Sequence, residues 1–101
     1  SPYFPSSEEE GTLAISNPEE SLYYLQVEIK ANETEETMYI SPLLAPNQSI
    51  NKDYLTDKSF VKGEYPATAY FHYYSKTGTT GTNEDYSYIG SMSAEIRMNI
   101  G

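Results

Sequence analysis

The sequence contains no cysteine and only one histidine among its 101 residues. The absence of cysteine excludes disulfide bonds, thiolate nucleophiles and zinc sites built on sulfur. No apolar run approaches the roughly 18 residues of a membrane-spanning helix, and no signal-peptide core is present. The chain opens on Ser1 rather than on a methionine, which leaves room for a leader or a membrane anchor removed before this numbering begins.

Basic residues are also scarce: six Lys and Arg stand against 15 Asp and Glu, for a formal charge of -9. Binding to nucleic acid needs a basic stripe that neutralises phosphates, so a nucleic-acid partner is excluded, and docking on anionic lipid is excluded for the same reason. Residues 1–36 hold nine of the acids and a single base, Lys30. We interpret these acids as a solvated arm and loop tips. The alternative is an acidic patch for a basic partner or Ca²⁺, but the regular spacing of a calcium loop is absent, so we expect no metal.

Hydrophobic residues make up only 38% of the chain, but eleven tyrosines supply large side chains that can be buried. The length allows one domain and no second one. Two prolines, three serines and three glutamates in residues 1–10 indicate a flexible acidic linker or an edge segment. Residues 11–101 are expected to form the domain.

Apolar residues recur at every second position through most of residues 11–101, which is typical of half-buried strands. Expected strands lie near residues 11–16, 23–30, 37–41, 49–55, 65–74 and 87–100, separated by turns rich in Asn, Pro and Gly. No helical stripe of useful length is present. The sequence therefore predicts an all-β fold, an antiparallel immunoglobulin-like β-sandwich of six to eight strands.

The alternation also predicts which side chains share the core. On this reading, the core residues are Tyr23, Leu25, Val27, Ile29, Ala69, Phe71, Ile96 and Met98. Met38 and Ile40 are expected to point inward with Tyr39 pointing outward. Residues 76–85, rich in Gly, Thr and Asn, are expected to form a mobile loop of ten residues.

Five stretches of the chain stand out as motifs: ISNP (15–18), YYLQVEI (23–29), YISP (39–42), APNQSI (45–50) and GEYPATAYF (63–71). Together they resemble a recurring pattern in small Ig-like domains of Gram-positive bacterial surface proteins. The resemblance spans residues 11–101, and its motifs concern structure rather than chemistry. It implies an Ig-like fold, an extracytoplasmic location at the cell surface through an N-terminal membrane anchor, and no catalytic residues to carry over.

The residues themselves offer little for catalysis. A Ser-His-Asp site would have to use His72, which lies in the middle of a predicted strand, and no Gly-x-Ser-x-Gly elbow occurs. Gly78 and Gly81 lack the following Lys-Ser/Thr and helix of a phosphate-binding loop. We therefore expect no enzymatic activity and no cofactor, and we interpret His72 as an exposed strand residue that contacts a cross-strand neighbour.

Tyr70, His72 and Tyr74 project from one face of a single predicted strand, and Tyr24 is expected on the outer face of a neighbouring strand. Exposed tyrosines with a polar rim are typical of recognition surfaces, although tyrosine also favours strands for stability alone. The sequence thus predicts a non-enzymatic spacer or protein-interaction module, monomeric or weakly dimeric. The alternative is a carbohydrate-binding or inhibitor-type module that uses this tyrosine face or the loop 76–85, with a surface glycan as partner.

Overall fold

The computed structural model describes residues 2–101, and these form seven strands and no helix, which confirms the predicted all-β class. The strands are β1 (Tyr3–Phe4), β2 (Gly11–Ser16), β3 (Tyr24–Ala31), β4 (Thr37–Ile40), β5 (Ser49–Asp53), β6 (Gly63–Thr80) and β7 (Asn83–Ile100). They belong to one sheet in the order β4-β3-β6-β7-β1-β2-β5. The described residues form no helix with the length and apolar character needed to cross a bilayer.

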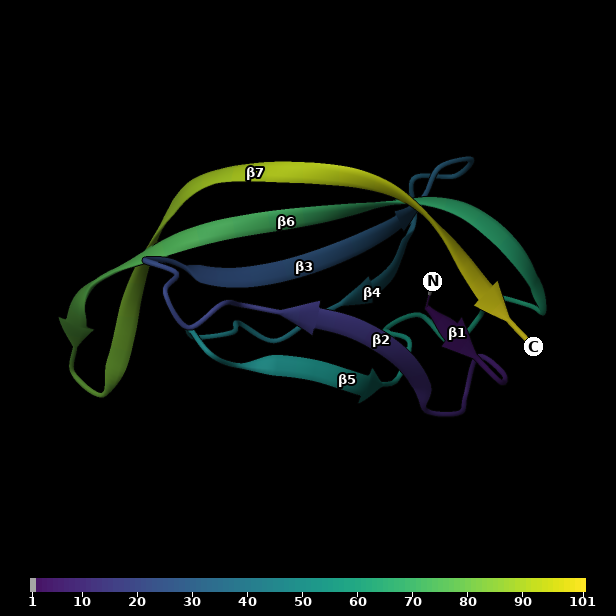
Figure 1. The fold of residues 1–101 in the computed structure, drawn as a ribbon, viewed down its shortest axis with the longest axis horizontal. Helices are drawn as coiled ribbons and strands as arrows, with labels where there is room; N and C mark the ends of the chain where they lie inside the picture. The colour runs from purple at the N-terminus through teal and green to yellow at the C-terminus, as the bar shows by residue number, and fades with distance from the viewer. Residues whose placement is uncertain (1) are drawn as a thin grey trace.

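The sheet is mixed rather than purely antiparallel, because β1 runs parallel to β7 while every other pair is antiparallel. It curls so that β2 and β5 lie below β3, β6 and β7 in Figure 1. Inward side chains from both ends of the sheet therefore share one core, which includes Leu13, Val27, Ala69 and Met98. Figure 1 also shows that β6 and β7 extend well beyond the other strands as a long hairpin.

The two edge strands of the sheet, β4 and β5, are joined by a partly buried polar contact. The Tyr39 hydroxyl donates a hydrogen bond of 2.7 Å to Asp53 Oδ2. Burial and the neighbouring carboxylate both raise the pKa of Tyr39 above its ordinary value, so the phenol stays neutral and donating. Thr56, which lies after the end of β5, also bonds to β4, since its amide donates to the Met38 carbonyl.

Most of the predicted core residues are buried. The prediction for Tyr23 is wrong, because this residue precedes β3 and is 39% exposed. Phe71 and Ile96 are only partly buried and pack against the core from its edge. The predicted alternation in β4 is also wrong, because Met38 and Tyr39 are both buried and Ile40 is exposed. The pairing of β4 with β3 shifts between Ile29 and Lys30, and such an irregularity changes which way the following side chains point.

The predicted mobile loop 76–85 is instead the paired end of the β6–β7 hairpin. Pairs continue as far as Thr80 and Asn83, and only two residues form the turn. Gly81 has a φ of 63°, which suits the first central position of a tight hairpin turn. Residues other than glycine rarely adopt this φ. Composition suggested a loop, but cross-strand pairing overrides the weak strand preference of Gly and Thr.

The first ten residues were predicted to be a flexible linker or an edge segment. In the structure, β1 lies inside the sheet between β7 and β2. Phe4 is 0% exposed and belongs to the core. A Cβ atom at Gly11 would collide with the Phe4 ring and the Tyr3 carbonyl, so this close approach requires glycine. The first strand therefore contributes to the core despite its length of two residues.

This placement predicts that Phe4→Ala lowers the free energy of unfolding by about 3 to 5 kcal/mol, as large-to-small changes in a packed core do. Tyr3→Ala is the matched control, because its side chain is 44% exposed. Urea denaturation followed by circular dichroism measures both. Equal, small losses for the two variants would show that Phe4 does not belong to the core.

Candidate recognition face

The outer face of β3, β6 and β7 carries the four residues predicted as a partner-binding face. Cross-strand register places Tyr24 opposite Tyr74, and Gln26 opposite His72. Glu28 lies opposite Tyr70 in the same ladder. The structure thus brings Tyr24, Tyr70, His72 and Tyr74 together on one side of the sheet, and we call this surface the aromatic face.

Strand β7 extends the aromatic face with residues that the sequence reading did not include. Tyr88 lies opposite Tyr74, and its ring meets the Tyr74 ring edge-on with centroids 5.7 Å apart. Tyr86 packs in the same manner against Tyr24 at 5.1 Å. These contacts depend on a shift in the β6–β7 pairing between Tyr73 and Tyr74, which leaves Ile89 unpaired. Strand alternation alone could not locate that shift.

Tyr70 and His72, two residues apart on β6, have parallel rings whose centroids are 6.2 Å apart. Lys30 Nζ approaches the Tyr70 ring at 5.9 Å from its centroid. Lys30 pairs with Thr68, on the side of Tyr70 away from His72, so both sides of the Tyr70 ring have a neighbour. These contacts restrict the orientation of the Tyr70 ring, and the residue is partly buried.

A hydrogen-bonded series fixes His72 in the middle of the aromatic face. Its Nε2 lies 3.3 Å from Glu28 Oε1, and its Nδ1 lies 2.6 Å from Ser91 Oγ. Because a carboxylate only accepts, Nε2 carries the proton, and in the neutral ring Nδ1 accepts from the Ser91 hydroxyl. The Ser91 oxygen can then accept from the Tyr88 hydroxyl, which is within hydrogen-bond distance.

Glu28 is held from the other side by Thr37, whose hydroxyl donates to Glu28 Oε2 at 2.7 Å. Burial by itself raises the pKa of a carboxyl group, but hydrogen bonds from Thr37 and His72 and the charge of Lys30 lower the pKa of Glu28 below its ordinary value of 4.5. The carboxylate is therefore ionised and serves as the acceptor that orients His72. Thr37 and Ser91 could not be predicted as partners from the sequence, because both contacts cross between strands.

The series Ser91–His72–Glu28 has the residue types of a hydrolytic catalytic triad. Acyl transfer also needs hydrogen-bond donors aimed at the developing oxyanion. On this face the backbone of β6 is already paired on both sides, with β3 and with β7. The hydrogen bonds of the series hold the His72 imidazole in place. The absence of enzymatic activity stays a prediction.

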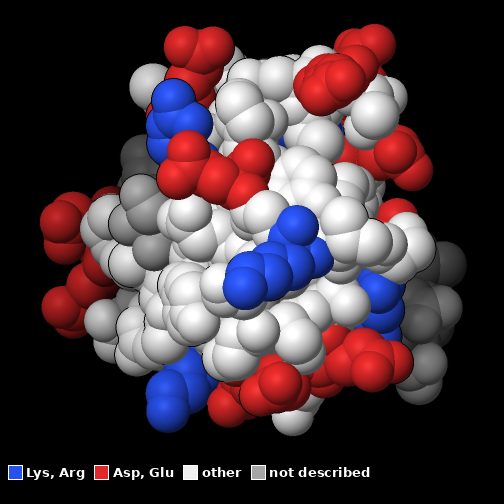
Figure 2. Space-filling view, turned by 90° about the vertical axis from the view of Figure 1, so that its right-hand side faces the viewer, with Lys and Arg blue, Asp and Glu red and all other residues white. Residues whose placement is uncertain are grey.

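Charged pairs lie toward both ends of the aromatic face. Lys76 and Glu84 form an ion pair of 2.7 Å on the extended hairpin, and Arg97 and Glu64 form another of 2.7 Å near the opposite end. Both pairs are well exposed. The acids do not form a single patch at the end of the molecule seen in Figure 2, where they lie in separate groups with isolated basic side chains between them. No three acidic or histidine side chains of the described residues gather as a metal site would require.

No protein-family model, curated protein or solved structure matches this chain.

The Glu28 series predicts a specific pH dependence of stability. A carboxyl group whose pKa is lowered by folding stabilises the fold above its unfolded pKa, and this contribution is lost as the pH falls through the lower folded value. Glu28→Gln should therefore cost about 1 kcal/mol at neutral pH and lose less further stability than the wild type as the pH falls below 4.5.

Chemical denaturation at a series of pH values measures this effect. Glu33→Gln removes the same charge from the exposed β3–β4 turn and should keep the wild-type profile. Parallel acid-side slopes for the wild type and Glu28→Gln would contradict the assigned role of Glu28.

Proposed function

We propose that this chain is an Ig-like sandwich module of a Gram-positive bacterial surface protein, located outside the cytoplasm, that binds a protein partner through the aromatic face. The fold part of this proposal rests on the curled all-β sheet with a shared core and on the sequence motifs described above. The location rests on the motifs alone. The module binds as a monomer or a weak homodimer and performs no chemistry.

The observation that carries the binding role is that the aromatic face is assembled and held before any partner arrives. Tyr24, Tyr74, Tyr86 and Tyr88 contact one another edge-on in two pairs, and His72 is fixed by two hydrogen bonds. Rigid aromatic side chains lose little conformational entropy on contact, and tyrosine is enriched among residues that dominate binding energy. Polar and charged groups at the ends of the face match the rim of an ordinary protein interface.

A surface glycan is the alternative ligand, because sugar rings stack on open aromatic faces. The neighbours on both sides of the Tyr70 ring favour the protein over the glycan. The carbohydrate-binding or inhibitor-type alternative that relied on a flexible loop at residues 76–85 is less favoured, since these residues belong to a paired hairpin. The acidic residues 8–20 are a weaker docking surface, because exposed carboxylates contribute of order 1 kcal/mol or less per pair after screening.

Paired variants test the proposal. The Tyr70→Ala/Tyr74→Ala double variant should lose a protein partner captured from a Gram-positive cell-surface fraction, with affinity for the purified partner reduced about a hundredfold. Tyr23→Ala/Tyr54→Ala removes two exposed tyrosines outside the aromatic face and should bind as the wild type does. Surface plasmon resonance measures the affinities, and a glycan array is probed in parallel.

Three outcomes would contradict the proposal. The first is glycan binding that depends on Tyr70 and Tyr74, which would favour the alternative ligand. The second is partner binding whose largest NMR shifts fall on residues 8–20 and spare the aromatic face. The third is a gene whose product carries neither a signal sequence nor a membrane anchor, which would contradict the location.

A further inference from the structure

The sheet has a gap in its hydrogen bonding between β7 and β2. β1 fills this position over only two residues, with Tyr3 and Phe4 opposite Asn99 and Ile100 of β7 and with Tyr3 opposite Thr12 of β2. Among the described residues, β7 before Asn99 pairs only with β6, and β2 after Thr12 pairs only with β5. Within residues 2–101, two strand edges therefore lie on either side of a gap that no strand fills, and we call this gap the seam.

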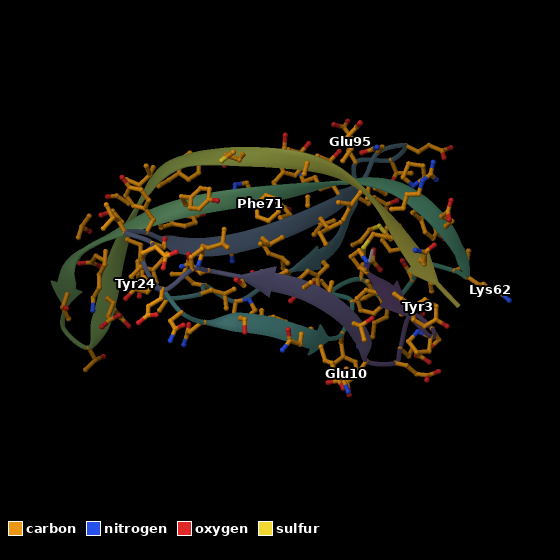
Figure 3. All side chains as sticks on the ribbon, in the orientation of Figure 1. Tyr3, Glu10, Tyr24, Lys62, Phe71 and Glu95 are labelled. Carbon is orange, nitrogen blue, oxygen red and sulfur yellow. The ribbon has the colours of Figure 1, made fainter. Side chains whose placement is uncertain are left out.

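An apolar groove underlies the seam. Its cavity of about 540 Å³ is lined by Leu13 and Ile15 of β2, by Ala69 and Phe71 of β6 and by Ile96 of β7, with Pro2 at the end next to β1. In Figure 3, Phe71 lies within the curl of the sheet, whereas Glu95 projects away from β7 on the outer side. Among the described residues that line the groove, Glu95 is the only charged one.

The inner face of β7 is uncovered where it borders the seam. Met98 and Ile100 on this face are buried, but Ala94 is exposed and Met92 is 67% exposed. Register confirms that both belong to the inner face, since Met92 lies opposite Phe71 and Ala94 lies opposite Ala69. β7 has 18 residues and β2 only six, so β2 is too short to cover it.

We propose that the seam binds an extended peptide strand from another polypeptide by β-strand addition, with apolar side chains at alternate positions. β1 already shows how a strand occupies this position: the amide of Asn99 donates to the Pro2 carbonyl at 3.2 Å, and that of Gly101 donates to the Phe4 carbonyl at 2.7 Å. A peptide that continues this ladder runs parallel to β7 and antiparallel to β2, as β1 does.

The dimensions and charge of the seam define the peptide further. The free edge of β2 from Leu13 to Ser16 is four residues long, roughly 13 Å at about 3.3 Å per residue. Alternate apolar side chains enter the groove, and the others face outward. Because the chain carries a formal charge of -9 and the groove borders Glu95, lysines at the outward positions favour association.

This site is separate from the aromatic face, which lies on the opposite side of β6, so the proposal goes beyond the proposed function and stands or fails independently of it. Ala69 and Phe71 point into the groove, whereas Tyr70 and His72, their neighbours in sequence, point outward. A strand in the seam would supply hydrogen bonds to two open edges, which folded proteins otherwise have to protect.

The test uses a blocked synthetic peptide that alternates valine with threonine and lysine, titrated into the ¹⁵N-labelled protein. We expect amide shifts over residues 13–16 and 91–97, with the tyrosine rings of the aromatic face unchanged. Hydrogen exchange should slow at the alternate amides of β7 (residues 91, 93, 95 and 97) that, like those of Asn99 and Gly101, point away from β6. The same peptide with N-methyl groups at alternate residues cannot complete the ladder and should bind about tenfold or more weakly.

Ala94→Arg places a long charged side chain in the seam and should weaken peptide binding about tenfold, whereas Ser93→Arg puts the same charge on the opposite face of the same strand and should leave binding unchanged. Met92→Arg is a second blocking variant at an already exposed position, for use if Ala94→Arg fails to fold.

Several results would overturn the proposal: no binding at millimolar peptide, equal binding by the N-methylated peptide, or equal effects of Ala94→Arg and Ser93→Arg. Slow exchange of the β7 amides of residues 91, 93, 95 and 97 in the free protein would also overturn it, because the edge that faces away from β6 would then already be paired.

Discussion

The register of β6 between β3 and β7 determines the character of both faces of the molecule. Successive residues of a strand point to opposite sides, so the pairing of Val27 with Phe71 also fixes the pairing of Glu28 with Tyr70. One side of the ladder supplies the core and the wall of the groove, and the other supplies the aromatic face. A slip by one residue would exchange the two sides, which burial of one face strongly disfavours.

Strand length is the second constraint, and it explains why the core is closed at one end and open at the other. At the closed end β1 bridges β7 and β2 and buries Phe4. The edge strands β4 and β5 meet elsewhere through Tyr39 and Asp53, so the curl is held by polar contacts as well as by apolar burial. Because β1 is only two residues long, the edges of β7 and β2 beyond it form the seam, and the short strand β2 leaves part of the inner face of β7 uncovered.

The sequence predicts those parts of the fold in which a regular pattern decides the outcome. Alternation identifies the inward residues of β2, β3 and β6, and it places Tyr24, Tyr70, His72 and Tyr74 on the outer side, where the structure has them. The strands flanking the turn at residues 32–36 were also predicted, because a polar stretch separates two alternating runs.

Features that depend on distant parts of the chain could not be predicted from the sequence. The inward turn of Tyr39 depends on an irregular pairing with β3, and the pairing of residues 76–80 with 83–86 overrides their loop-like composition. Tyr3 and Phe4 form a strand between two prolines because β7 and β2 lie on either side of them. Similarly, the exposure of Met92 and Ala94 follows from the length of β2 and not from their own residue types, and the contacts of His72 with Ser91 and Glu28 join three separate strands.

The register of β6 is tested most directly by side-chain NOEs in an NMR spectrum of the free protein. The structure requires NOEs between the rings of Tyr74 and Tyr88 and between those of Tyr24 and Tyr86, and a separate set that joins Phe71 to Val27 and Met92. It allows none between the Tyr70 or His72 rings and the methyl groups of Val27 or Ile29. NOEs between His72 and Val27 would show that the strand is turned over, and would contradict both the aromatic face and the groove beneath the seam.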